Sequence, residues 1–220
     1  MRLGLPTLPF DRRMAAPGRG FRASHDFRPL VRGGWHSLHP EIRTRFDGIL
    51  GRDASAFAGA MTVRLSPVGR LFALACVPLG RPLPLRVADA VPVDIRVTRA
   101  GLCAMRWRRD LGTGPDRKSC CSRKTVDPYR GLLEVVDGGL GMCLEVRADH
   151  GDLVFESRGF FLRLGRLHIP LPLWLTPGRA RVEHRQVAGD RFRYRLTFRH
   201  PLFGLTVEQD GIFAPRGELQ

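Results

Sequence analysis

The stretch RFRYRLTFRHPLFGLTVEQDGIF, residues 191–213, is the clearest indication of the fold in this chain. In its first half, apolar residues alternate with polar ones that are mostly arginine, and the apolar residues are Phe192, Tyr194, Leu196 and Phe198. This repeat of two residues is typical of a strand with one face in the core and the other in water. The segment HPLFG (200–204) interrupts the alternation, which resumes at Leu205. Because proline cannot donate to a strand ladder and glycine tolerates positive φ, HPLFG predicts a hairpin between the last two strands.

The two-residue repeat recurs over most of the chain. From residue 91 onward it is carried first by Val91, Val93, Ile95 and Val97. We predict further strands at residues 57–65, 102–109, 117–125, 132–136, 141–147, 153–157 and 179–186, with two short strands in 160–169. About ten short strands joined by glycine-containing turns indicate a large antiparallel sheet. Such a sheet curls or partly closes into a barrel, which protects its edges.

Two helices are predicted ahead of most of the strands. The first runs from Pro40 to about residue 50, and its apolar face consists of Ile42, Phe46, Ile49 and Leu50. Ser66 is a capping residue before Pro67, and the run up to Gly80 predicts the second helix. This run is apolar nearly all round, so we expect it to be buried against the sheet. The predicted fold class is α+β, mainly β: a large curved antiparallel sheet or partly closed barrel of about ten strands with two N-terminal helices packed on it.

A single β-rich domain is predicted for residues 26–214. Residues 1–25 contain proline, glycine and arginine without periodicity, so we expect a mobile tail there and a second short tail at 215–220. Met14 is an alternative start of translation. No apolar run approaches the roughly 18 to 20 residues of a spanning helix, and the N-terminus lacks the apolar core of a secretory signal. We therefore expect a cytoplasmic protein with no transmembrane segment.

The net charge of +15 raises the question of nucleic-acid binding. Only Lys118 and Lys124 are lysines, and the arginines are spread over nearly every segment. Nucleic-acid binders normally concentrate basic residues in patches with aromatic residues placed for stacking. The distribution therefore favours a solvated basic surface over a nucleic-acid interface. The alternative is an anionic surface or nucleic acid bound through the arginines of 191–199.

Cysteine and histidine spacing predicts neither a metal site nor a cofactor. The five cysteines form no C-x-x-C pair, which is against a disulfide framework and a standard zinc site. The seven histidines show no spacing typical of metal ligands. His184 and His200 are nevertheless included in a candidate pocket, although a histidine beside a turn usually hydrogen-bonds the backbone.

A set of polar residues in the middle of the sheet is the best candidate for a site. Trp107 and Arg109 share one face of their predicted strand, as do Cys120, Ser122 and Lys124 on the next. Glu134 lies in the apolar run LLEVV and needs a partner, because an unpaired buried carboxylate costs several kcal/mol. Arg109 or Lys124 could provide it. The candidate pocket or polar cluster comprises Trp107, Arg109, Lys124, Glu134, His184 and His200, and the alternative is an ion pair that only fixes strand pairing.

Several segments together resemble a bacterial family of unknown function, domain-of-unknown-function family 4166. They are LHPEIRTRF (38–46), LFALACVPLGRPLPL (71–85), VPVDIRV (91–97), W-x-R at Trp107 and Arg109, S-x-K at Ser122 and Lys124, GLLEVVDGGLGMCLEV (131–146), LTPGRARVEHR (175–185) and the opening stretch. The resemblance covers about residues 26–213. It implies an auxiliary or ligand-binding role, in some members beside a dehydrogenase-like domain, and it assigns no catalytic residues.

Three functions are compatible with these patterns. The first is a binding module that holds a small apolar or amphipathic ligand in a sheet-lined cavity. The second is an enzyme, or an auxiliary domain of an oxidoreductase partner, that uses Glu134 with Arg109 or Lys124. The third is binding of an anionic surface or nucleic acid through the arginine-rich strand face. We favour the binding module, because inward apolar strand positions are abundant and polar groups are few.

Overall fold

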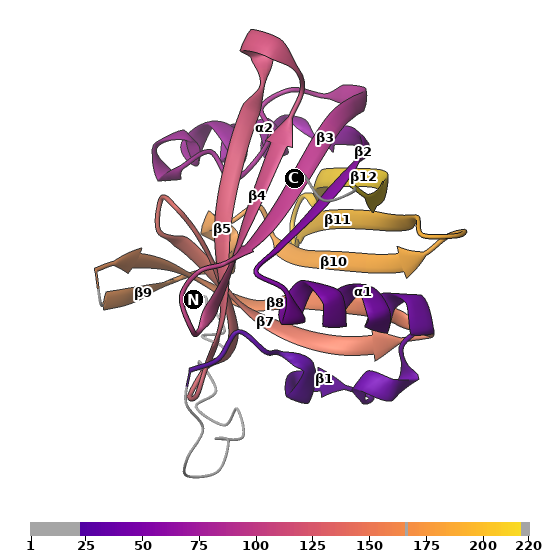
Figure 1. Ribbon diagram of the computed structural model, residues 1–220. Coiled ribbons are helices and arrows are strands. Elements are labelled where there is room, and N and C mark those ends of the chain that lie inside the picture. The colour runs from indigo at the N-terminus through magenta and orange to yellow at the C-terminus, as the bar shows by residue number, and fades with distance from the viewer. Residues whose placement is uncertain (1–22, 166, 217–220) are drawn as a thin grey trace.

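The computed structural model describes residues 23–165 and 167–216, and its main feature is a closed antiparallel barrel (Figure 1). Ten strands form the ring, which closes where β12 pairs with β2. The prediction of a β-rich fold with two helices is confirmed, and the barrel is fully closed. Closure removes the exposed strand edges that an open sheet of this length would present.

Each strand of the ring pairs with the next ring strand along the chain, and the last of them pairs with the first. They are β2 (Ala54–Leu65), β3 (Ala88–Arg99), β4 (Ala104–Leu111), β5 (Lys118–Asp127), β6 (Gly131–Val136), β7 (Leu140–Asp149), β8 (Asp152–Leu164), β10 (Arg179–Gln186), β11 (Phe192–His200) and β12 (Gly204–Pro215). Two short strands lie outside the ring: β1 (Val31–Arg32) pairs in parallel with β7, and β9 (Leu167–Leu171) pairs with β8. One expectation needs correction, because residues 153–164 form a single long strand and not two.

The stretch that opened the sequence analysis forms β11 and β12, joined by a turn at residues 201–203. Phe192, Tyr194 and Phe198 are buried as predicted, and the register shifts by one residue between Phe198 and Arg199. Gly204 begins β12 with a φ of 65°, which explains the glycine at this position. The predicted hairpin is therefore confirmed.

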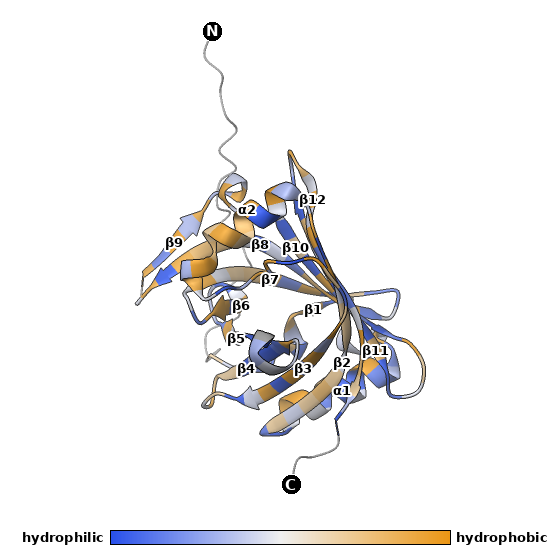
Figure 2. Cartoon of the chain, turned by 90° about the horizontal axis from the view of Figure 1, so that it is seen from above, coloured by the Kyte–Doolittle hydropathy of each residue, from blue (hydrophilic) through white to orange (hydrophobic). Residues whose placement is uncertain are grey.

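Helix α1 (Pro40–Gly51) covers one end of the barrel, and we call this the α1 end. Its predicted apolar face is buried, and Phe46 retains only 1% of its surface. That face contacts Phe27 and Phe155 in the larger of the core clusters. Figures 1 and 2 show α1 and the second helix on opposite sides of the barrel.

Helix α2 (Pro67–Ala75) lies at the other end of the barrel and is followed by a short 3-10 helix, Val77–Leu79. The predicted cap is confirmed, because the Ser66 hydroxyl accepts a hydrogen bond from the backbone of Gly69. The helix lies against the sheet as expected, but the expectation that it is buried there is wrong for most of its residues. Only Gly69 and Ala73 of α2 are buried, whereas Leu71 and Leu74 are 66% and 57% exposed. The helix lies across the rim of the barrel, so one side packs on β12 and the other faces outward (Figure 2).

The turn between β6 and β7 meets the segment after α2, and this contact helps to close the second end. A Cβ atom at Gly138 would lie 1.9 Å from the carbonyl carbon of Leu79, so only glycine fits there. A smaller core cluster lies beneath, formed by Ala73, Leu83, Phe160, Ala180, Phe198 and Val207. The glycines of this turn therefore serve both a hairpin and a close packing contact.

Most of the predicted tail residues, 1–22 and 217–220, lie outside the described part of the chain. Near the first boundary, Ser24 forms an antiparallel bridge with Val126. Near the second, the backbone of Arg216 donates to the carbonyl of Ala56. The domain boundaries at 26 and 214 stay predictions.

Candidate functional site

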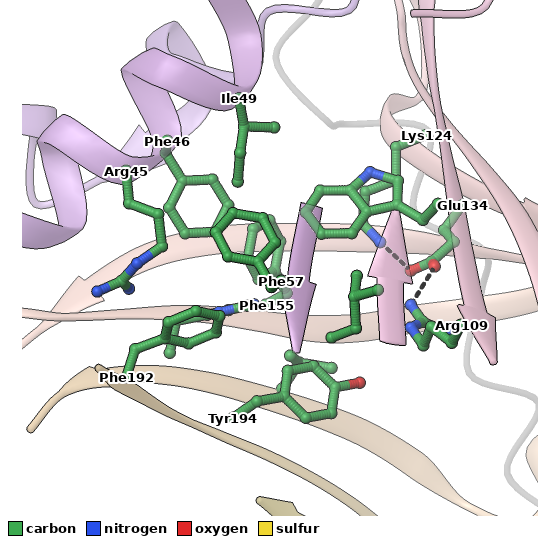
Figure 3. Close-up of a pocket in the computed structure, with 14 residues that line it drawn as sticks. Arg45, Phe46, Ile49, Phe57, Arg109, Lys124, Glu134, Phe155, Phe192 and Tyr194 are labelled. Carbon is green, nitrogen blue, oxygen red and sulfur yellow. Dashed lines mark hydrogen bonds and ion pairs between the residues drawn. The ribbon is translucent and has the colours of Figure 1, made fainter. Parts of the chain in front are cut away.

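A buried carboxylate, Glu134 of β6, is the centre of the candidate site. The strand register places Lys124 of β5 directly opposite it, and Arg109 of β4 lies one strand further round the barrel. Lys124 Nζ is 2.8 Å from Glu134 Oε2, and Arg109 Nη2 is 3.3 Å from Oε1. The Ser122 hydroxyl also donates to Glu134 Oε1 at 2.6 Å. The side chains that the sequence placed on common strand faces therefore converge inside the barrel (Figure 3).

The ionisation of this cluster is set by competition between burial and pairing. Burial raises the pKa of Glu134, but Lys124 and Arg109 outweigh it and lower the pKa to about 2. Burial also lowers the pKa of Lys124, an effect that Glu134 opposes. The pKa of Arg109 is raised because Tyr194 and Glu134 together outweigh its burial. With Glu134 ionised, two cations face one carboxylate, so the cluster carries one excess positive charge.

Two cavities flank the cluster within the barrel. The first has a volume of about 30 Å³ and lies towards α1, where Arg45, Phe46 and Ile49 line it. The second has a volume of about 60 Å³ and lies towards the α2 end, where Leu83 and Phe160 line it. Both are lined by Arg109, Glu134, Phe155, Val182 and Tyr194, which form the wall between them. Each is large enough for a few water molecules, since one water needs about 10 to 15 Å³ of such volume.

The first cavity gathers polar atoms that lack partners. Three buried nitrogens with no hydrogen-bond partner among the described residues belong to its lining: Trp107 Nε1, His184 Nδ1 and Arg45 Nη1. An unmade hydrogen bond of a buried group costs about 1–3 kcal/mol, so three at one cavity are unusual. The indole and guanidinium nitrogens can only donate, whereas the His184 nitrogen donates or accepts according to its tautomer.

Aromatic side chains form most of the remaining lining. The Lys124 ammonium lies 4.8 Å from the centre of the Trp107 ring, and the Arg45 guanidinium lies 4.0 Å from that of Phe192. His184 is surrounded by aromatic rings, with centroid distances of 5.0 Å to Phe46 and 5.4 Å to Tyr194. Burial, together with nearby Arg45, Lys124 and Arg109, lowers the pKa of His184 well below its usual value. The imidazole is therefore neutral at pH 7.

Arg45 of α1 is a site residue that the sequence reasoning missed. Burial lowers its pKa to about 10, although Glu41 and Asp190 partly oppose the shift. Its guanidinium donates to the side-chain oxygen of Gln186. Helical spacing was an available signal, because Arg45 lies three residues after Ile42 and four before Ile49, on the buried face.

Comparison with known protein families agrees with the resemblance seen in the sequence. A family profile, described as a domain of unknown function (DUF4166), matches residues 38–213. This chain belongs to the DUF4166 family. The match includes both helices and the ten strands of the ring, and it therefore contains Arg45 and all six predicted site residues. No curated protein matches the chain.

One predicted site residue of this DUF4166 domain lies apart from the others. His200 is buried near the turn at 201–203, where its Nδ1 accepts a hydrogen bond from the backbone of Leu202 at 3.1 Å. Its ring stacks on Phe203 with a centroid distance of 4.7 Å. His200 lines neither interior cavity. The structure thus brings together Trp107, Arg109, Lys124, Glu134 and His184 and leaves His200 at the α2 end.

Two outward arginines of β11 in the DUF4166 domain pair with carboxylates of β12. Arg193 donates to Asp210, and Arg195 donates to Glu208 at 2.6 Å. These pairs partly neutralise the strand face that the arginine pattern singled out.

No helix among the described residues is long and apolar enough to cross a membrane. Within the same part of the chain, no cluster of three or more His, Cys, Asp or Glu residues could hold a metal ion. The five cysteines are free.

Proposed function

We propose that this DUF4166 domain is a binding module for a small amphipathic molecule with an acidic head group, held inside the barrel. One observation carries the proposal. Unpartnered donors and an excess positive charge meet at the same aromatic-lined cavity. A carboxylate would accept hydrogen bonds from Trp107 and Arg45 and would balance the charge of Arg109 and Lys124. The apolar part of the molecule would lie against Phe46, Phe57 and Phe192.

Because the two interior cavities are small, binding of a ligand requires part of the protein to move. Volumes of about 30 and 60 Å³ are far below the roughly 300 Å³ at which ligand pockets begin. A ligand larger than a few atoms therefore needs α1 to move outward or the wall between the cavities to shift. Helix α1 suits such a movement, because it makes few contacts with the barrel apart from its apolar face and contains Gly48, which weakens a helix.

The geometry supports binding better than acid–base catalysis. A general base works best with a pKa near the operating pH, and a carboxylate whose pKa is about 2 is a weak base at neutral pH. Glu134 also retains only 8% of its side-chain surface and has three protein partners. Its role in the proposal is to hold Arg109 and Lys124 in place. An auxiliary role beside an oxidoreductase, which the family resemblance implies, stays a prediction.

The test compares three probes that differ only in the head group: octanoate, octanamide and octylamine. Calorimetry and native mass spectrometry would measure their binding to the purified chain. Octanoate should bind most tightly, with the amide weaker by about ten- to a hundredfold, because a charge-assisted hydrogen bond contributes about 1.5–3 kcal/mol. Octylamine should not bind, since its ammonium would lie beside two cations.

Two variants distinguish binding at the interior cluster from binding elsewhere on the protein. Replacing both Arg109 and Lys124 with Met should abolish the preference for octanoate over octanamide. Arg193→Met, on the outside of the barrel, should leave it unchanged. Equal affinity for all three probes, or no binding of octanoate at millimolar concentration, would refute the proposal.

A further inference from the structure

Acidic residues are absent from three long stretches of the chain, residues 54–88, 157–182 and 191–207. Parts of all three meet at the end of the barrel that carries α2. We call this region the α2 end: α2 and the segment to residue 87, the hairpin of β8 and β9, residues 172–179, and the turn at 201–203. The turn between β6 and β7 adjoins this region and carries one acidic residue, Asp137, which is paired with Arg106.

Direct contacts join these segments. The Phe72 ring of α2 lies 5.9 Å from His200, whose ring stacks on Phe203 in the turn. The Thr206 hydroxyl, just beyond this turn, donates to the carbonyl of Pro177. The backbone of Arg163 in β8 donates to Gly139 at 2.8 Å, beside the glycine that packs on the segment after α2. Figures 1 and 2 both show α2 and β9 on the same side of the molecule.

Large hydrophobic side chains are exposed at this end. Of the fifteen exposed large hydrophobic residues in the described part of the chain, eleven lie in the three acid-free stretches. They include Leu71, Leu74, Trp174, Leu202 and Phe203, whose exposed fractions run from 53% to 78%. Isolated exposed leucines are ordinary, but a concentration of them on one end of a domain marks an interaction surface.

Exposed arginines lie in the same three acid-free stretches. They include Arg70, Arg81, Arg86, Arg163, Arg179 and Arg199. None of the six forms an ion pair with another described residue, whereas Arg64 and Arg195 close by are paired with Asp89 and Glu208. Arg179 and Arg199 are even direct neighbours across β10 and β11. Like charges opposite each other destabilise a sheet, so this pair calls for an external anion.

We propose that the α2 end docks on the surface of an anionic lipid bilayer. Exposed leucines and a tryptophan would enter the boundary between head groups and acyl chains, and the arginines would contact the lipid phosphates. The apolar side chains come from one helix and several turns, which suits shallow insertion. An acidic protein would match the arginines equally well, but it would need a shaped surface to cover leucines that protrude from separate segments. Nucleic acid would leave those leucines in water.

The location of the second cavity extends this inference. Pro82, Leu83 and Pro177 line that cavity from the α2 end. A docked domain would therefore hold the end of the barrel nearest this cavity against the bilayer, where amphipathic acids dissolve. This extension rests on the function proposed above, whereas docking itself depends only on the surface residues.

Vesicle sedimentation tests docking with the whole chain. Vesicles of phosphatidylcholine alone are compared with vesicles that contain 30 mol% phosphatidylglycerol, a composition we choose for the assay. The chain should sediment with the anionic vesicles and much less with the neutral ones. Trp174 provides a second readout, because its emission should shift to shorter wavelength as the indole leaves water. The Trp174→Phe variant should lose the emission shift and keep most of the sedimentation.

Variants at the two ends of the barrel make the test specific. Leu71→Ser with Leu74→Ser should weaken vesicle binding by about tenfold or more. Arg81→Ser with Arg86→Ser should weaken it by about twenty-fivefold, since each arginine near an anionic surface contributes about fivefold. The control is Leu102→Ser, because Leu102 is 87% exposed at the opposite end, beside the C-terminus of α1. It should bind as the parent does.

Three outcomes would overturn the docking proposal. One is no sedimentation with anionic vesicles, and another is equal weakening by the Leu102 control. The third is binding that survives the leucine changes and is matched by heparin, which would indicate a general polyanion site. Octanoate binding in the interior is measured separately, so failure of docking leaves the proposed function standing, and the reverse also holds.

Discussion

Carboxylates pair with basic side chains both inside the barrel and on its outer face, but the two groups of ion pairs differ in their exposure to water. Inside, Glu134 is paired with Lys124 and Arg109, and its side chain is 8% exposed. Outside, Asp210 is paired with Arg193, and the two side chains are 26% and 43% exposed. Water screens the outer pair and hydrates whatever the pair leaves unsatisfied. Inside the barrel, only another polar or charged group can satisfy what the ion pairs leave over. The excess positive charge of the Glu134 cluster therefore points to a ligand.

The largest change in stability should follow removal of the carboxylate inside the barrel. Glu134→Ala leaves two buried cations unpaired and should lower the free energy of unfolding by about 3–5 kcal/mol. Urea denaturation followed by circular dichroism measures this change. The control replaces all three charges, with Met at 109 and 124 and Leu at 134, and it should recover most of the lost stability. A loss below about 1 kcal/mol in Glu134→Ala would mean that water already reaches the cluster.

A smaller effect on stability, one that depends on pH, is expected from His184. Its pKa in the folded state is well below 6.5, so below pH 6.5 the unfolded chain binds a proton that the folded chain does not. The free energy of unfolding should therefore fall as the pH drops from 7 to 5, by up to about 1.4 kcal/mol per pH unit below 6.5. His184→Phe should flatten this dependence. The matched control is His150→Gln, since His150 has a 98% exposed side chain, and an identical slope in both variants would contradict the account.

The smallest effect is expected at the outer pair. Asp210→Asn removes the partner of Arg193 at the surface and should change the free energy of unfolding by less than about 1 kcal/mol. The change should shrink further in 1 M salt. A loss as large as that in Glu134→Ala would remove the distinction between the interior and the outer face.

Much of the fold and of the interior cluster could be predicted because both depend on periodicity. Alternation determined which strand residues face inward, and the apolar neighbours of Glu134 required a basic partner close by. Closure of the barrel was less accessible, because it depends on the pairing of β2, the first strand of the ring, with β12, the last, and these two strands lie far apart in the sequence. No local pattern contains that information.

The errors share a physical origin. Helix α2 is apolar nearly all round, which in most proteins indicates burial, yet it lies on the rim with its outer side uncovered. His200 was grouped with the interior residues although it begins the segment that interrupts the alternation, and it lies beyond the register shift at Phe198 with its Nδ1 hydrogen-bonded to the backbone of Leu202. Arg45 was missed because an arginine on a helix is normally assumed to face water. In each case tertiary context overrode a local rule.

We propose that the barrel interior accepts the acidic head group of an amphipathic molecule. The NMR signal of the Trp107 indole N–H provides a direct test of this claim. The chain has three tryptophans, so a ¹H–¹⁵N spectrum shows three indole signals, and assignment needs only single Trp→Phe variants. Octanoate should shift the Trp107 signal downfield as its carboxylate accepts the unpartnered hydrogen, while the Trp35 signal stays in place. A Trp107 signal that does not move at saturating octanoate, or that moves equally with octylamine, would contradict the claim.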